Sequence, residues 1–277
     1  MTRLIVDSTF GIPKKFAEEN NIEVVNLKMI IGEEIFDEGF EDSWPVFYEK
    51  MKTSKIWPTT SQPSPADFMD AIDKIYSQDK DAEILILTIS NSLSGTINAA
   101  TIAKNNYKDK KIVAHDSGQA ATCGRLLTEE LIYHINNGVT FDELISLLPT
   151  IENALKIQFI PATMEALKKS GRVGKLSATV ADILKIKPLF KFENGKVSIQ
   201  KKVLGLGRAI ADAITLLPKK IKKLYACYIY DKVNVPKILE KLKSMLGIEK
   251  VEEVCLEPVF GIHVGIGSIG IASLAEY

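Results

Sequence analysis

The chain has 277 residues, of which 46% are hydrophobic and 25% charged, a globular composition that can bury a core shared between two domains. Its 35 basic residues balance 35 acidic ones, so no whole-chain positive field is expected to recruit nucleic acid or an anionic membrane. The three cysteines are widely spaced and form no CxxC pair, which argues against a disulfide framework or a cysteine-based zinc site.

The first half of the chain alternates strand-like and helix-like patterns. The N-terminal residues read as a first strand rather than a signal peptide, and no apolar run approaches the roughly 18 residues that span a bilayer, so we expect a cytoplasmic protein. Strands are predicted at residues 4–6, 22–25, 84–88 and 112–114, and helices over 66–75 and 97–103. This alternation predicts βαβ units and a parallel sheet.

The second half has a different pattern. Two helices are predicted between residues 118 and 148, separated near Asn137 and Gly138, followed by a strand at 157–160. Asn194-Gly195 predicts a type I′ turn in a hairpin over residues 188–199. Further elements are a helix at 209–217, a strand at 225–230, a helix at 235–246, and two strands around a glycine turn between 251 and 274. We therefore predict an α/β protein with a domain boundary near residue 150.

Polar segments follow three of the predicted strands. The longest, residues 88–96, carries five hydroxyl side chains and a glycine between a strand and a helix, and the others are residues 7–9 and 116–117. Ligands of open parallel sheets lie beyond the carboxyl ends of the strands, so these segments should share one rim. Their hydroxyl and backbone N–H groups would bind an anion without a fixed positive charge.

A second group of hydroxyl residues lies in the segment 58–65, which we predict to be a loop. Ser64 is a natural helix N-cap and Pro65 a natural first helical residue. These roles leave Thr59, Thr60 and Ser61 without a local structural explanation.

Two glycine-containing segments resemble nucleotide-binding motifs without meeting their requirements. Gly265, Gly267 and Gly270 match G-x-G-x-x-G, but the seven residues that follow are too few for a dinucleotide fold, which leaves a structural or a ligand-facing turn. Residues 168–175 lack the spacing of a P-loop. Gly171 there is expected to end a helix, and Arg172 is a candidate anion clamp.

The histidines and serines leave one alternative function open. His115 and His134 are expected to be packed, whereas His263 lies among small residues that leave its imidazole accessible for a site role. The histidines lack metal-ligand spacing, so no metal is expected. The sharp G-x-S-x-G elbow is absent, but Ser94, His263 and an aspartate from distant segments could assemble a hydrolase or acyltransferase triad.

Seven short motifs occur in the order and spacing of the DegV family, namely VDST at 6–9, TSQP at 60–63, LSGT at 93–96, DS at 116–117, KSGRV at 169–173, KIKP at 185–188 and HVG at 263–265. The chain resembles this family over nearly its whole length. DegV proteins are bacterial fatty-acid-binding proteins with two α/β domains. Some are the acyl-carrying subunits of a fatty acid kinase, whose separate ATP-binding subunit phosphorylates the bound carboxylate.

The resemblance implies a two-domain DegV-like fold. Residues 1–150 would form a Rossmann-like parallel-sheet domain with the carboxylate-binding loops, and residues 151–277 an α/β domain with a mixed sheet that contributes to the acyl pocket. It also implies a protein that is not itself an enzyme and needs no cofactor. Its partners would be a long-chain fatty acid and an ATP-binding fatty acid kinase subunit, and transient membrane contact is compatible with that role.

The resemblance also assigns site residues. Thr60 and Ser94 would hold the carboxylate, with Ser61 and Gly95 beside them. His263 and Arg172 match positions next to the carboxylate or involved in phosphotransfer. Each buried methylene contributes roughly 0.8 kcal/mol, so a long acyl tail would supply affinity on the order of 10 kcal/mol before binding costs.

Two departures from the family pattern bear on phosphotransfer. Members that work with a kinase carry an arginine where this chain has Leu204, and Arg208 is the cation that would have to replace it. Before LSGT, the usual Ser-Ser-Gly is replaced by Ser90-Asn91-Ser92, which alters loop flexibility more than hydrogen-bond donors. We therefore expect carboxylate binding to persist and phosphotransfer to be weak.

Overall fold

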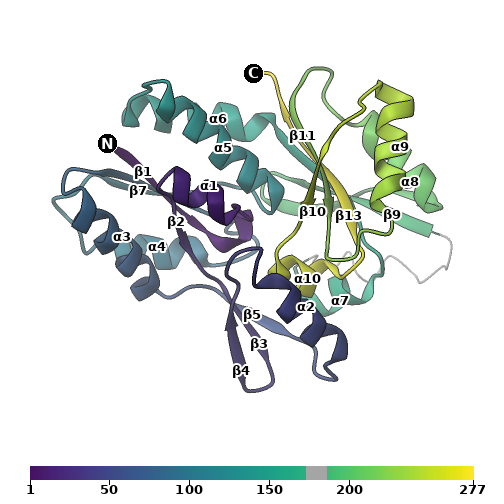
Figure 1. The fold of residues 1–277 in the computed structure, drawn as a ribbon, viewed down its shortest axis with the longest axis horizontal. Coiled ribbons are helices and arrows are strands. Elements are labelled where there is room, and N and C mark those ends of the chain that lie inside the picture. The colour runs from purple at the N-terminus through teal and green to yellow at the C-terminus, as the bar shows by residue number, and fades with distance from the viewer. Residues whose placement is uncertain (173–185) are drawn as a thin grey trace.

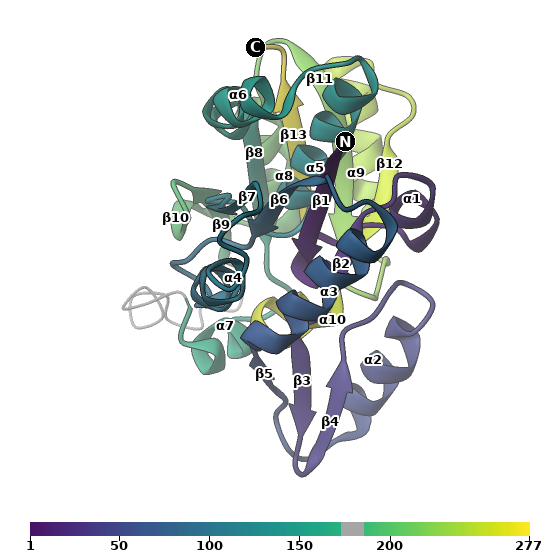
Figure 2. The same cartoon turned by 90° about the vertical axis from the view of Figure 1, so that its left-hand side faces the viewer.

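The computed structural model describes residues 1–172 and 186–277. Within these residues the chain forms a parallel sheet near the N-terminus, a mixed sheet near the C-terminus and a small antiparallel sheet (Figures 1 and 2). The parallel sheet has the order β2 (Glu23–Val25), β1 (Thr2–Asp7), β6 (Glu83–Thr88), β7 (Ile112–Asp116). The four predicted strands of the first half are confirmed, each within a few residues of its expected bounds.

The mixed sheet has six strands, in the order β10 (Lys196–Leu204), β9 (Ile186–Glu193), β8 (Leu155–Ile160), β13 (Ile269–Ala275), β11 (Ile221–Tyr228), β12 (Glu252–Cys255). Only β11 and β12 pair in parallel. Asn194 and Gly195 both have positive φ, at 51° and 74°, as the predicted type I′ turn requires. The α/β class and the combination of a parallel and a mixed sheet are confirmed.

The small sheet was not predicted. It contains β4 (Glu34–Asp37), β3 (Lys28–Ile31) and β5 (Thr59–Ser61), and it projects from the body of the molecule together with helix α2 (Trp44–Thr53) (Figure 2). The expected loop at residues 58–65 is therefore partly wrong, because residues 59–61 pair with β3. The capping of the next helix is confirmed, since the Ser64 side chain accepts a hydrogen bond from the Asp67 backbone and Pro65 begins the helix.

Helices cover both faces of the two larger sheets. Ile5 of β1 packs toward α3 (Pro65–Gln78) and α4 (Thr96–Lys104), whereas Leu4 and Val6 face the opposite core. That core is continuous with one face of the mixed sheet and contains α5 (Thr122–Asn136) and α6 (Phe141–Ala154). The other face of the mixed sheet is covered by α8 (Leu206–Thr215) and α9 (Val235–Leu246). The short helices α1 (Lys14–Glu19), η1 (Ser8–Phe10), α7 (Glu165–Ser170) and α10 (Pro258–Val264) complete the described elements.

The domain boundary near residue 150 stays a prediction. That position lies inside α6, after the last strand of the parallel sheet and before the first strand of the mixed one. Across the described ranges, no helix is both long and apolar enough to pass through a lipid bilayer.

The C-terminal segment corrects one sequence prediction. The two expected strands and the glycine turn are present as β12, β13 and residues 265–267, but residues 258–264 between β12 and this turn form helix α10, which was not predicted. One glycine and β-branched residues lower the intrinsic helix propensity of this segment. Packing overrides that propensity, because a Cβ on Gly261 would lie 2.5 Å from the Tyr48 ring, so only glycine lets the helix approach so closely.

Candidate functional site

The structure brings all six predicted ligand-binding residues to one pocket. The pocket lies where β5, the loop before α4, the end of α7 and helix α10 meet, and the six residues are Thr60, Ser61, Ser94, Gly95, Arg172 and His263. Apolar side chains, among them Leu93, Phe159 and Phe260, form the rest of its wall. We call it the polar pocket.

Among the described residues, one hydrogen bond joins two predicted site residues across this pocket, and it links Thr60 to His263. Thr60 is the middle residue of β5 and pairs with the buried Met29 of β3, so its side chain is on the face of the small sheet that packs against α10. The Thr60 Oγ1 atom lies 2.8 Å from the Nε2 atom of His263. The small sheet therefore positions the hydroxyl, and α10 positions the imidazole.

His263 is a neutral imidazole at ordinary pH. Burial and, to a smaller extent, the positive charge of Arg172 together lower its pKa to about 4. Its Nδ1 atom is buried and has no hydrogen-bond partner among the described residues. The expectation of an accessible imidazole is corrected: His263 is mostly enclosed, because α10 packs it between neighbouring elements instead of displaying it in a glycine loop.

Ser94 and Gly95 lie at the start of α4. The Ser94 Oγ atom is 2.9 Å from Oγ1 of the buried Thr96, so Ser94 has a hydroxyl partner and still lines the pocket. Gly95 is the N-cap residue of the helix, and a Cβ there would lie 2.5 Å from Oε1 of Gln62. The glycine thus lets Gln62 approach, which adds an amide to the pocket wall that sequence reasoning did not single out.

Arg172 lies at the edge of the pocket, just after α7. Gly171 ends this helix in the left-handed conformation, with φ of 66°, as predicted. The Arg172 guanidinium donates to the backbone oxygen of Ser170 at 2.9 Å, and its backbone N–H donates to the Ser170 hydroxyl. The rest of the predicted basic turn, residues 173–175, lies outside the described residues, as does the start of the KIKP motif.

The polar segments after β1, β6 and β7 share one rim, as predicted. The Asp7 carboxylate accepts from the backbone N–H of Ile89 at 2.7 Å, and Ser117 donates to the backbone oxygen of Thr88. Most hydroxyls of residues 88–96, however, have structural partners. Ser90 and Ser92 both donate to the backbone oxygen of Gly195, which fastens this loop to the β9–β10 turn. Of this loop's hydroxyl side chains, Ser94 is the one that lines the polar pocket.

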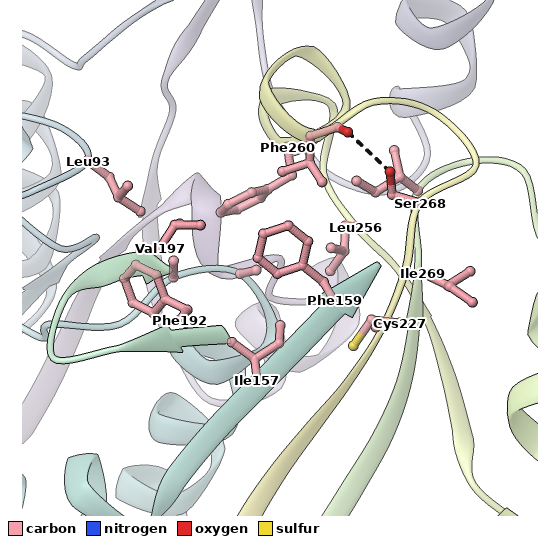
Figure 3. Close-up of a pocket in the computed structure, with 15 residues that line it drawn as sticks. Leu93, Ile157, Phe159, Phe192, Val197, Cys227, Leu256, Phe260, Ser268 and Ile269 are labelled. Carbon is pink, nitrogen blue, oxygen red and sulfur yellow. Dashed lines mark hydrogen bonds between the residues drawn. The ribbon is translucent and has the colours of Figure 1, made fainter. Parts of the chain in front are cut away.

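An apolar pocket adjoins the polar one. Both pockets are lined by the same five residues, Leu93, Phe159, Val197, Phe260 and Val264. In Figure 3, Phe159 of β8 and Phe260 of α10 lie near each other, with Leu93 and Val197 on one side and Cys227 on the other. The deeper wall is almost wholly apolar and includes Ile157, Phe192, Cys227, Leu256 and Ile269. The site thus combines a polar end with an apolar interior.

The glycine turn of the G-x-G-x-x-G match joins α10 to β13. Gly265 and Gly267 have positive φ, and Gly270 lies in β13 against the backbone oxygen of Gln158. Ser268 and Gly270 line the apolar pocket, so the turn is both structural and exposed to the cavity.

The arrangement does not assemble the serine triad. Ser94 contacts Thr96, and His263 contacts Thr60. Asp7 is bound by Thr9 and Ile89, and Asp116 by the backbone N–H groups of Asn91 and Gly118. In the described part of the chain, the imidazole Nδ1 atom therefore has no carboxylate to orient it.

The other two histidines have packing partners, as expected. His115 Nε2 lies 2.6 Å from a carboxylate oxygen of Glu152, and His134 Nε2 lies 2.9 Å from the hydroxyl of Tyr277. Among residues 1–172 and 186–277, no group of three or more His, Cys, Asp or Glu side chains is arranged to hold a metal ion.

Comparison with known proteins decides the family. A family model described as "Uncharacterised protein, DegV family" matches residues 1–276. The chain belongs to the DegV family. A DegV domain-containing protein of Clostridium perfringens is 32% identical to it, with 99% of each chain covered.

Solved structures of DegV proteins share the fold. A DegV lipid-binding protein from Thermotoga maritima superposes with a TM-score of 0.88 at 27% identity, covering 99% of this chain and 98% of that one. A DegV family protein from Thermus thermophilus, whose structure is described as showing fatty acid binding, has a TM-score of 0.86 at 25% identity and 99% coverage of both chains.

Proposed function

We propose that this DegV protein binds a long-chain fatty acid, with the carboxylate in the polar pocket and the acyl tail in the apolar one. The observation that carries the proposal is the adjacency of the polar and the apolar pocket, which share five lining residues. The lipid-binding relatives from Thermotoga and Thermus support it. An amphiphile with one small polar end fits this division of the cavity.

The hydrogen-bonding capacity of the polar pocket suits a carboxylate. If the neutral His263 carries its proton on Nε2, it donates to Thr60 Oγ1 and leaves the threonine O–H free to donate to the ligand. If Thr96 donates to Ser94, the serine O–H is free in the same way. Two hydroxyl donors then hold the carboxylate near the first turn of α4, where the helix dipole favours negative charge.

We place Arg172 at the mouth of this pocket as the positive group nearest the bound anion, with Ser61 and Gly95 completing its wall. The guanidinium approaches His263 closely enough to lower the imidazole pKa. Its charge favours an anion over a neutral lipid, while the hydroxyls orient the two oxygens.

The test is direct analysis of bound lipid. The purified protein is extracted with organic solvent, and the extract is analysed by mass spectrometry. We expect a fatty acid in stoichiometric amount, or stoichiometric uptake of added palmitate or oleate by protein stripped of lipid. Protein that contains no fatty acid and takes up neither of these would contradict the proposal.

We further propose that the protein presents its ligand to a separate ATP-dependent fatty acid kinase subunit, and that it does so weakly. Leu204 stands at the end of β10 with 70% of its surface exposed and brings no positive charge. The Arg208 guanidinium, the candidate replacement, is paired with Asp212 at 3.3 Å.

The prediction is that Leu204→Arg raises acyl phosphate formation by an ATP-binding subunit by about tenfold or more, since one added charge-assisted hydrogen bond contributes about 1.5–3 kcal/mol. Acyl phosphate is measured as its hydroxamate, with Val233→Arg, which adds the same charge at another exposed apolar position, as control. Equal, high rates for the parent protein and Leu204→Arg would contradict it.

A further inference from the structure

Three carboxyl groups that the proposed site does not use are buried around the start of α10. Asp7 at the end of β1 and Glu38 after β4 have no exposed surface, and Glu257, the N-cap residue of α10, has 1%. Acidic side chains are almost never fully buried unless paired. Their placement beside the helix that carries His263 calls for a physical explanation.

Glu38 connects three parts of the fold. One carboxyl oxygen accepts from the backbone N–H of Val259 in the first turn of α10, at 2.8 Å. The other accepts from the Ser8 hydroxyl at 2.6 Å, and Ser8 Oγ in turn accepts from the backbone N–H of Leu27. Glu38 also donates its own backbone N–H to the Leu27 oxygen. One side chain therefore joins α10 to the end of β1 and to the chain entering the small sheet.

The position of α10 determines the geometry of the polar pocket. His263 lies one turn after Val259, and its partner Thr60 belongs to the small sheet. Val259 and Ile262 pack in one cluster with Leu27 and Met29. A shift of the first turn of α10 would therefore move the imidazole relative to Thr60.

At neutral pH the negative charge of the cluster lies mainly on Asp7. Burial raises the pKa of Glu38 to about 8 and that of Asp7 to about 6, and it raises the pKa of Glu257 well above its usual value. For Glu38 the negative charge of Asp7 adds a smaller contribution to this rise, and the hydrogen bonds from Ser8 and Val259 oppose it. The other titratable or charged groups that interact with this cluster are Tyr48 of α2, Cys227 of β11, Cys255 of β12 and Arg125 of α5.

The nearest cation does not neutralise the cluster. The Arg125 guanidinium bonds to Glu129 at 2.8 Å and to Glu252 at 2.6 Å. The Oε1 atom of Glu257 is buried and has no hydrogen-bond partner among the described residues. If a second carboxyl beside Asp7 ionised, its negative charge would be buried next to another negative charge and would have no cation of its own. Such an arrangement costs free energy.

We propose that Glu38 is a positioning residue for the fatty acid site: its buried carboxyl accepts from the first turn of α10 and holds the helix so that His263 meets Thr60, and a second buried negative charge beside Asp7, formed at alkaline pH, loosens this arrangement and weakens ligand binding. The affinity part of this proposal rests on the proposed function. The positioning part concerns the unliganded protein as well. Because the folded-state pKa is raised, the stabilisation that Glu38 provides is present at low pH and is lost as pH rises through about 8.

The first experiment measures palmitate affinity between pH 6.5 and 9.5 for the parent protein, Glu38→Gln and Glu38→Ala. The glutamine keeps an acceptor for the Val259 N–H and a polar group against the Ser8 hydroxyl, but it does not ionise. We expect the parent to lose about tenfold in affinity across pH 8, as for a shift of about one pKa unit, while Glu38→Gln stays level. Glu38→Ala should be weaker at every pH. Glu34→Ala serves as control. It removes an exposed carboxylate of β4, the strand that precedes Glu38. This carboxylate is paired with Lys50 of α2, and the affinity of the variant should depend on pH as that of the parent does.

The second experiment needs no ligand. The chain has three histidines, so the ¹⁵N resonances of its imidazoles can be assigned by substitution. We expect His263 to show one neutral tautomer at neutral pH in the parent and in Glu38→Gln. In Glu38→Ala we expect averaged tautomers. Thermal unfolding of each variant confirms that it is folded.

A Glu38→Gln variant that loses affinity at alkaline pH like the parent, or a folded Glu38→Ala with an unchanged His263 spectrum, would overturn the positioning role. Absence of palmitate binding by any variant, with the His263 changes as expected, would instead overturn the proposed function alone.

Discussion

Replacing Thr60 with valine and Ser94 with alanine is expected to cause the largest loss of fatty acid affinity. Each substitution removes one hydroxyl donor to a carboxylate, and hydrogen bonds to charged groups contribute about 1.5–3 kcal/mol, so each should weaken binding by about 10- to 150-fold. Valine has nearly the shape of threonine and suits a strand, so β5 should persist in Thr60→Val. Affinity is measured by calorimetry or by displacement of a fluorescent fatty acid.

Thr60→Val has a further consequence that separates it from Ser94→Ala. It leaves the His263 Nε2 atom without its hydroxyl partner, whereas Ser94→Ala leaves only Thr96 without one. Thr60→Val should therefore have the larger effect.

Two exposed hydroxyls bonded within their own helices provide matched controls. Thr101→Val in α4 and Ser146→Ala in α6 should leave affinity within about a factor of two, because surface substitutions away from such sites change free energies by at most about 0.5 kcal/mol. Unchanged affinity in the double variant Thr60→Val/Ser94→Ala would place the carboxylate elsewhere.

The strands of both large sheets were predictable because their residues are locally consistent. Residues 84–88 form a continuous apolar run that ends in a polar loop, as a strand covered on both faces should. The hairpin at Asn194 and Gly195 was predictable for a similar reason, because a type I′ turn needs positive φ at both positions. In these cases one short stretch of sequence is enough to predict the strand or the turn.

The small sheet and α10 could not be predicted in this way. β3, β4 and β5 are only three or four residues long; β3 and β4 mix charged with apolar side chains, and β5 has hydroxyl side chains alone, so no periodicity can be recognised. Helix α10 forms because Tyr48 and Glu38 hold it, although its sequence disfavours a helix. The information that forms these elements lies in tertiary contacts.

The sequence motifs predicted which residues form the site, but they did not predict how these residues are arranged. Thr60 and His263 are 203 positions apart, and no local pattern indicates that their side chains meet. The hydroxyl-rich loop illustrates the converse: its serines indicated a ligand, yet Ser90 and Ser92 bind Gly195 of the hairpin. Hydroxyl side chains serve turns, tertiary contacts and ligands alike, so the sequence could not assign each one.

The second large effect should come from the apolar pocket, through the length of the acyl chain. Palmitate has six more methylenes than decanoate, and at roughly 0.8 kcal/mol for each buried methylene the difference is about 5 kcal/mol, or roughly a thousandfold or more in affinity. This gradient requires that the tail be fully buried. It is measured with a series of saturated fatty acids below their critical micelle concentrations.

A substitution at Cys227 is expected to change how affinity depends on the length of the acyl chain. It lines the apolar pocket but not the polar one, and burial raises the pKa of its thiol to about 12, so it acts as a small uncharged group. Leucine at this position adds two heavy atoms to the wall of a cavity. We therefore expect Cys227→Leu to weaken palmitate binding by about 10- to 100-fold, the contribution of two to three buried methylenes, and to leave decanoate binding almost unchanged.

The ratio of the two affinities separates loss of tail space from loss of folding. A destabilised variant would bind both ligands less well, whereas a shortened pocket discriminates between them. Cys255→Leu is the matched control, because Cys255 is a partly buried cysteine of β12 that does not line the apolar pocket, and its palmitate-to-decanoate ratio should equal that of the parent. If Cys227→Leu also left the ratio unchanged, the tail would have to follow another path, and the apolar pocket would be a packing defect rather than the acyl site.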